Sequence, residues 1–352
     1  MLPTGRQRRR NYFAFRKISI VSFLISVFIF SLYCASSPTE KKENNNLSEH
    51  EKLQIFHSSA EENLAPTRWD GGYTTTSNEA RLDIFEPHIR NLGGGYIGVG
   101  SSQNFAMAAW ADSQWIWLVD FTKVVVMVNK VHILFAKTAD TPEKFIKIWH
   151  HSEKKAAVDL INKEYKNHPD LELIKKAYNK ARRLVNDSFN DYLYFTKTYR
   201  LKNWLTDKSL YQRIHNLAKT GRIRALKGDL NGSVTIQGIS KAAKEMNVPV
   251  RICYFSNAEE YFFYEDVFKK NWSTIFSDSK SMILRTLSVS KWLYPWAPGS
   301  EYFDVKGFHY NIMPVHVFQS VLSKNKNDKF YVTEFIKMSK VNKEKGFSLL
   351  KK

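Results

Sequence analysis

Short apolar runs that alternate with helical patterns constrain the fold of this chain more than any other feature. Residues 96–100 form an apolar run that ends in glycine, residues 105–111 favour a helix, and residues 115–120 form an apolar run that ends in an acid. A continuous apolar run of this length suits a strand covered on both faces. Together the three segments predict a strand–helix–strand unit.

The same alternation returns later in the chain. It predicts strands at 223–230, 248–255, 282–285 and 308–312, and helices at 235–246 and 258–270. Strands that alternate with helices in this way form parallel sheets, because each crossover helix returns the chain to the same edge. We therefore predict an α/β fold with a mainly parallel sheet and helices on both faces.

A long helical stretch separates the two strand–helix–strand units. Residues 124–135 are ambiguous, since their β-branched side chains favour a strand while their apolar spacing is helical; we interpret them as a helix. Residues 142–219 show helical periodicity and few breakers. They predict roughly two to four further helices, a helical insertion longer than a plain crossover requires.

The N-terminus is typical of an export signal. Six cations and no acid lie within residues 1–33, and the apolar run at 18–33 ends directly before Cys34. This resembles a bacterial lipoprotein signal with Cys34 as the lipidated residue, although Tyr33 is bulkier than the residue usually found there. An uncleaved signal anchor and ordinary secretion are the alternatives. Residues 34–77 are polar and predict a flexible tether with one short helix near 49–57.

Composition and net charge limit the kinds of partner that the chain can bind. With 352 residues, of which 43% are hydrophobic, the chain can bury a full core, which we place at 78–330, before a basic tail at 331–352. The net charge of +19 favours anionic partners such as lipid headgroups or an acidic envelope polymer. Export makes nucleic acid the weaker choice. The lysines between 142 and 220 are explained more simply as a solvated helical face.

Cysteine and histidine give no metal site. Cys34 and Cys253 are the two cysteines of the sequence, so a disulfide framework is excluded, and Cys253 lies in an apolar strand pattern. His150 and His151 have no companion ligands at metal spacing. We assign no metal.

Candidate site residues follow the predicted strands, because ligands of open α/β sheets bind outside the carboxyl ends of the strands. Gly98 and Gly100 would let the backbone approach a ligand, and the next helix would offer free amides to an anion. Asp120 ends the second strand, where nucleotide-binding folds place the acid that binds ribose hydroxyls. A structural turn with a buried cap is the alternative.

Three later positions allow the same two interpretations. Asp229, after Gly228, could contact a ligand or close an Asx-turn. Ser256, Asn257 and Glu260 could line the cleft or cap a helix in the manner of a capping box. Arg285 follows an apolar run and could hold an anion in the cleft.

Several of these segments resemble a bacterial family classed as a domain of unknown function, which includes leptospiral-type lipoproteins. The shared stretches are residues 96–105, 228–232 and 254–262, with the Leu-Arg-Thr at 284–286. The resemblance implies a Rossmann-like fold in the layout of class I methyltransferases. It also implies cleft positions, which are Gly98, Gly100, Gln103, Asn104, Asp120, Gly228, Asp229, Ser256, Asn257, Glu260 and Arg285.

The sequence leaves two classes of function. The first is a lipoprotein of the bacterial cell envelope, exported and anchored in the membrane through a lipid on Cys34, which binds an acidic envelope polymer or a small nucleoside-like ligand. The second is an enzyme, a methyltransferase that uses S-adenosylmethionine. Export favours the first, because S-adenosylmethionine is a cytoplasmic cofactor. A fold does not by itself establish a reaction.

Overall fold

Five parallel strands form the centre of the sheet in the computed structural model, which describes residues 47–66, 75–289, 307–327 and 329–350. They are β1 (Gly95–Val99), β2 (Trp115–Asp120), β3 (Ile223–Lys227), β4 (Val250–Tyr254) and β5 (Met282–Ser288), in the spatial order β3-β2-β1-β4-β5. The chain order reverses between β1 and β4, so their carboxyl ends flank the switch point where such sheets bind ligands. The predicted mainly parallel sheet is confirmed in this part of the chain.

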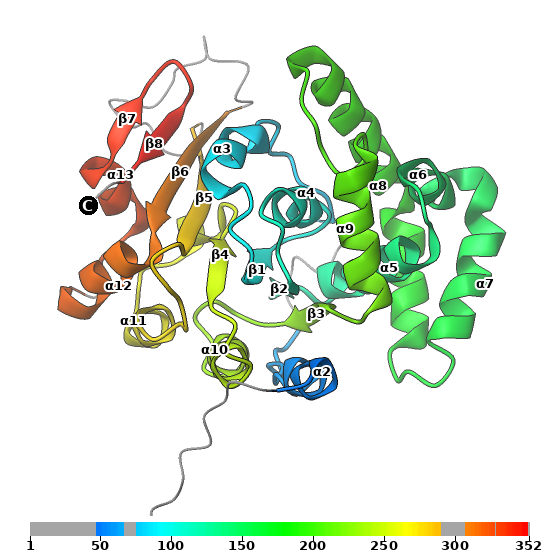
Figure 1. Ribbon diagram of the computed structural model, residues 1–352, viewed down its shortest axis with the longest axis horizontal. Coiled ribbons are helices and arrows are strands. Elements are labelled where there is room, and N and C mark those ends of the chain that lie inside the picture. Colours follow the sequence, from blue (N-terminus) through cyan, green and yellow to red (C-terminus); the bar gives the residue numbers. More distant parts are fainter. Residues whose placement is uncertain (1–46, 67–74, 290–306, 328, 351–352) are drawn as a thin grey trace, which may run out of the picture. The chain divides into compact units, whose positions relative to one another are not determined.

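Helices cover both faces of the sheet (Figure 1). One face carries α3 (Glu86–Ile89), α4 (Gln103–Trp110) and α5 (Lys123–Thr138), and the other carries α2 (Glu49–His57), α10 (Thr235–Glu245), α11 (Asp266–Ser273) and α12 (Val315–Lys324). Alternate residues of each strand enter different cores: Ile116 and Leu118 pack on the first face, Trp117 and Val119 on the second. This period of two explains why the strands are apolar throughout.

The predicted helical insertion is present between β2 and β3. It consists of α5, α6 (Pro142–Trp149), α7 (Lys154–Glu164), the long α8 (Leu171–Tyr199) and α9 (Lys208–Lys219), with a short 3-10 turn at His151–Glu153. Residues 124–135 are helical, as we interpreted them. Phe145, Trp149 and Tyr178 are fully buried in the same core as the sheet face beneath them. The insertion is therefore part of the α/β domain.

The C-terminal region differs from the prediction. β6 (Phe308–Pro314) pairs antiparallel with β5, β8 (Phe347–Leu349) pairs parallel with β6, and β7 (Lys340–Asn342) pairs antiparallel with β8. The sheet is therefore mixed. The segment predicted as a basic tail folds as α13 (Val332–Met338), β7 and β8, because Val332, Phe335 and Ile336 supply an apolar face to the core.

The N-terminal boundary also differs. The short helix predicted near 49–57 is α2, but it packs on the sheet: Phe56 is fully buried with its ring 5.0 Å from that of Trp115 and 4.8 Å from that of Trp117. The folded region therefore begins well before residue 78, and the described part of the predicted tether is ordered by this contact. The predicted signal at 1–33 and Cys34 lie outside the described residues.

Two features of the described residues bear on membrane anchors and metals. In this part of the chain no helix has both the length and the apolar character needed to cross a bilayer. The same residues hold no group of three or more His, Cys, Asp or Glu side chains that could bind a metal ion. Cys253 lies in β4 and is buried, as its apolar pattern predicted.

Candidate functional site

The glycine turn after β1 is shaped by the side chains that follow it. Asn104 is fully buried: its Nδ2 donates to the carbonyls of Val99 (3.0 Å) and Ser101 (2.9 Å), and its Oδ1 accepts from the Tyr96 hydroxyl (2.8 Å). A Cβ at Gly98 would overlap Asn104 Oδ1. The glycine therefore makes room for a side chain of the protein itself.

Gln103 completes the same arrangement. Gly100 has φ +91°, a backbone conformation that favours glycine, and a Cβ there would overlap the Gln103 amide. Gln103 Oε1 accepts from the amide of Ser101 at 2.9 Å. One of the amides that could bind an anion at the start of α4 is thus already bonded within the turn.

A residue that the sequence analysis missed supports this turn from α5. Asn129 is fully buried and its Nδ2 donates to the carbonyl of Gly100 at 2.8 Å. The available signal was an amide side chain directly after the apolar run at 124–128 and before the mostly apolar residues 131–135. A polar residue on the buried side of an amphipathic helix commonly binds a backbone group.

Asp120 lies where the sequence placed it, at the carboxyl end of β2, and it is only 7% exposed. Its Oδ1 accepts from the amide (2.8 Å) and the hydroxyl (2.7 Å) of Thr122, which fixes the start of α5. The Asp120 carbonyl also accepts from the amide of Gly228 at 2.9 Å, which joins the turns after β2 and β3. The carboxylate is therefore bonded to Thr122, the residue that directly precedes α5.

The turn after β3 is an Asx-turn, which was the structural alternative to a ligand contact. Asp229 Oδ1 accepts from the amide of Asn231 at 2.9 Å, which is the Asx-turn that the sequence left open. Gly228 lies against Thr235 so closely that a Cβ would overlap the Thr235 side chain. Glu62, from the N-terminal segment, reaches this turn and bonds its amides.

The turn after β4 meets a second acid that the sequence analysis missed. Glu79 is 4% exposed and accepts hydrogen bonds from four hydroxyls, those of Ser77 (2.5 Å), Tyr254 (2.6 Å), Ser256 (2.8 Å) and Thr286 (2.5 Å). Burial, followed by the Glu79 charge, raises the pKa of Tyr254 well above its ordinary value, so the phenol keeps its proton. Ser256 is thus brought to the carboxyl end of the sheet, where an acid of the chain binds it.

Asn257 and Glu260 belong to the same turn. Asn257 Nδ2 lies 3.5 Å from Glu260 Oε2, in a contact between two side chains. Asn257 precedes the 3-10 helix at Ala258–Tyr261, but its side chain makes no capping bond there, so the capping box suggested as an alternative is not formed. Glu260 Oε1 accepts from the amide of Ser288 at the end of β5, and Glu260 is 4% exposed. These two residues therefore tie the turn after β4 to β5.

Arg285 lies away from the edge of the sheet that is formed by the carboxyl ends of the parallel strands. It is fully buried, its Nε donates to Glu259 at 2.6 Å and its Nη1 donates to Asn311 at 3.0 Å. The guanidinium also lies over the rings of Phe318 (5.2 Å) and Phe335 (5.1 Å), from α12 and α13. Burial raises the pKa of Glu259, and Arg285 opposes this shift. The alternation of β5 side chains sends Arg285 into the core, not into the cleft.

A small pocket lies at the start of α4. It has a volume of about 20 Å³ and is lined by polar and aromatic side chains and one leucine: Ser77, Ser102, Gln103, Ser188, Phe189, Tyr192, Trp204 and Leu205. Such a volume holds about one water molecule. A drug-sized ligand occupies a pocket of roughly 300 Å³ or more.

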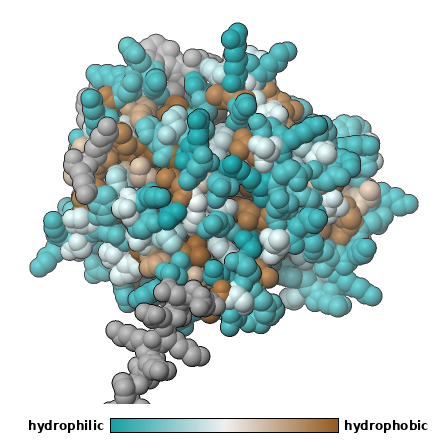
Figure 2. All heavy atoms as spheres, viewed as in Figure 1, coloured by the Kyte–Doolittle hydropathy of each residue, from teal (hydrophilic) through white to brown (hydrophobic). Residues whose placement is uncertain are grey.

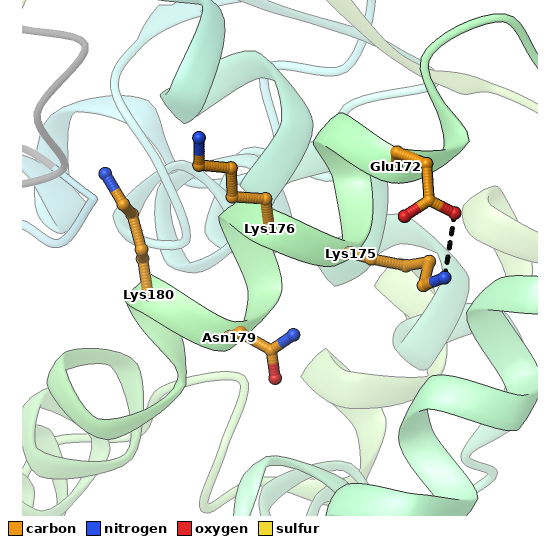
Figure 3. Close-up of a pocket in the computed structure, with 5 residues that line it drawn as sticks. All are labelled: Glu172, Lys175, Lys176, Asn179 and Lys180. Carbon is orange, nitrogen blue, oxygen red and sulfur yellow. Dashed lines mark hydrogen bonds and ion pairs between the residues drawn. The ribbon is translucent and has the colours of Figure 1, made fainter.

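A larger and more open groove of about 520 Å³ lies on α8, lined by Glu172, Lys175, Lys176, Asn179 and Lys180. Lys175 pairs with Glu172 at 2.8 Å, while Lys176 and Lys180 extend to the same side of the helix (Figure 3). Residues 142–219 hold 17 Lys and Arg against nine Asp and Glu. Hydrophilic side chains dominate the face drawn in Figure 2, with smaller apolar areas among them. The insertion therefore presents a cationic surface.

These features define an α/β domain. Its parallel strands have the order found in nucleotide-binding open sheets, and the turns at their carboxyl ends are bonded by side chains of the protein itself. This chain belongs to the family described as Domain of unknown function (DUF7790), whose model matches residues 74–351. No curated protein matches it. Among solved structures it is similar to the rRNA methyltransferase aviRa from Streptomyces viridochromogenes, with 11% identity and a TM-score of 0.28 over 70% of this chain and 84% of that chain. A TM-score this low does not establish a shared function.

Proposed function

We propose that this protein is a membrane-anchored binding protein of the bacterial cell envelope, and that its α/β domain serves as a scaffold without turning over a nucleotide cofactor. The observation that carries the proposal is the pocket of about 20 Å³ at the start of α4. A nucleotide-binding relative would need room for an adenosine between the turn after β1 and the acid that ends β2. Gln103 and Asn104 instead bond the glycine turn internally.

The anchor rests on the N-terminal sequence. The six cations and the apolar run before Cys34 fit a lipoprotein signal that exports the chain and leaves Cys34 as the acylated first residue. Labelled palmitate should enter the wild-type protein and not a Cys34→Ala variant. Equal labelling of both, or of neither, would exclude a lipid on Cys34.

The proposed partner is an anionic envelope polymer or lipid surface, bound through the lysines of α8. For the unit from Asn44 to Lys352, which lacks Cys34, the double variant Lys176→Gln with Lys180→Gln should bind phosphatidylglycerol vesicles about 30-fold more weakly, at about 1 kcal/mol per lysine. The control replaces the exposed Lys241 and Lys244 of α10 in the same way. Equal losses in both variants would show that net charge, and not the α8 groove, governs binding.

One observation favours the alternative of a methyltransferase that uses S-adenosylmethionine. The parallel strand order β3-β2-β1-β4-β5, with Asp120 at the end of β2, is the layout in which such an acid binds ribose. Titration calorimetry with S-adenosylmethionine separates the two functions. Micromolar binding that Asp120→Ala abolishes would support the enzyme, and no heat up to millimolar ligand would support the scaffold.

A further inference from the structure

The N-terminal segment at 58–66, here called the strap, runs from α2 along the end of β3. The amide of Glu62 donates to the Lys227 carbonyl at 3.1 Å, and Glu61 Oε2 accepts from the Lys227 amide at 2.9 Å. Lys227 Nζ also donates to the carbonyl of Leu64 at 2.5 Å. These contacts hold the strap beside the turn that connects β3 to α10.

The strap carries one carboxylate into that turn. Glu62 Oε2 accepts from the amide of Asp229 at 2.7 Å, and Glu62 Oε1 accepts from the amide of Val234 at 3.1 Å. The Glu62 residue is 8% exposed. Each oxygen of the carboxylate thus receives a main-chain donor, one from Asp229 in the turn and one from Val234, which directly precedes the eleven-residue helix α10. The dipole at this end of the helix favours negative charge.

The turn is shaped to admit this group. A Cβ at Gly232 would overlap Glu62 Oε1, so the carboxylate lies directly against a bare Cα. The backbone of Glu62 is held as well, because its amide lies 3.1 Å from Thr235 Oγ1, which in turn donates to the Lys227 carbonyl at 3.0 Å. The glycine is required by the group that occupies the turn and not by the path of the backbone alone.

The turn and its occupant come from different parts of the chain. The family model begins at residue 74, so the whole turn at 228–234 belongs to the family domain, whereas Glu62 and the strap lie outside it. The carboxylate therefore comes from outside the matched residues, whereas the turn that receives it lies within them.

We propose that the turn at 228–234 is an oxyanion-binding site and that Glu62 is its intramolecular occupant. Its ligand is a molecule with a carboxylate or a phosphate group, since both groups present two oxygens to the amides of Asp229 and Val234. Ligand and strap exclude each other, so the site opens when the strap lifts. This site is independent of the anchor, of the α8 groove and of S-adenosylmethionine.

The test uses the full-length chain in detergent with Glu62→Ala, which removes the occupant and leaves the turn. Sodium acetate should raise the Tm of this variant in a saturating manner, beyond sodium chloride at equal ionic strength, and should leave the wild-type Tm at the chloride value. Sodium phosphate in a parallel series distinguishes a phosphate ligand from a carboxylate ligand. If the variant does not fold in chloride, the yield of folded protein on refolding in acetate or phosphate is the readout.

Two further variants locate the effect. Glu344→Ala removes an exposed carboxylate outside the strap and should show no rescue by either anion. Gly232→Ala should destabilise the wild type, be tolerated together with Glu62→Ala, and abolish the rescue, because the new methyl group occupies the oxyanion position. The proposal is wrong if neither anion exceeds chloride for Glu62→Ala, or if Gly232→Ala leaves the rescue intact.

Discussion

His132 should make the insertion sensitive to acid. The imidazole is fully buried among the rings of Phe145, Trp149 and Phe189, and neither ring nitrogen has a hydrogen-bond partner in the described structure. Burial lowers the pKa of His132 from 6.5 to about 3. The unfolded chain therefore takes up a proton on this residue between pH 6.5 and pH 3, while the folded chain does not.

The sign and size follow from this difference. A base whose folded pKa is lowered contributes full stability above its unfolded pKa and loses that contribution as the pH falls below 6.5. The full shift corresponds to about 5 kcal/mol, and the part lost between pH 7 and pH 5 is about 2 kcal/mol. His309, whose pKa burial lowers to about 4, adds a loss of the same sign over its own window.

His132→Phe removes the proton acceptor and keeps an aromatic ring in the cluster. Urea unfolding of the unit from Asn44 to Lys352, followed by tryptophan fluorescence, gives the free energy of unfolding at pH 7 and pH 5. The free energy of unfolding of the variant minus that of the wild type should be about 2 kcal/mol larger at pH 5 than at pH 7. His151→Gln, on an exposed ring, is the control and should show no such growth. A constant difference for His132→Phe would refute the reasoning.

Three further variants test the packing. Phe56→Ala should lower the unfolding free energy by about 3–5 kcal/mol, measured in urea, because it removes a fully buried ring; a change as small as that of the exposed control Gln54→Ala would show that α2 is not part of the domain. Arg285→Met should cost about 3–5 kcal/mol by leaving Glu259 buried without its ion pair; addition of Glu259→Gln should recover part of this loss, and no recovery would contradict the pairing. Gly98→Ala should cost about 1–3 kcal/mol in the wild type and less beside Asn104→Ala, as a thermal double-mutant cycle can measure; strictly additive losses would contradict the overlap.

The sequence determined the order and type of the main elements. Apolar runs covered on both faces gave the central strands, and a period near 3.6 gave the insertion helices, because burial imposes these patterns on the residues themselves. It also placed Gly98, Asp120 and Asp229 at strand ends, and it offered the Asx-turn of Asp229 as an alternative before the fold was known. These features depend on neighbours along the chain.

Only the tertiary structure shows which side chains bond the turns at the carboxyl ends of the strands. Glu62 and Glu79 lie more than 160 residues from the turns they bond, and nothing in their local sequence indicates a partner at that separation. Arg285 follows an apolar run in the sequence, and only the packing of α12 and α13 on this face of β5 shows that its side chain lies in the core beside Glu259. Contacts between distant segments therefore determine which groups bond these turns. Such contacts cost chain entropy, and burial and hydrogen bonds between the segments offset that cost.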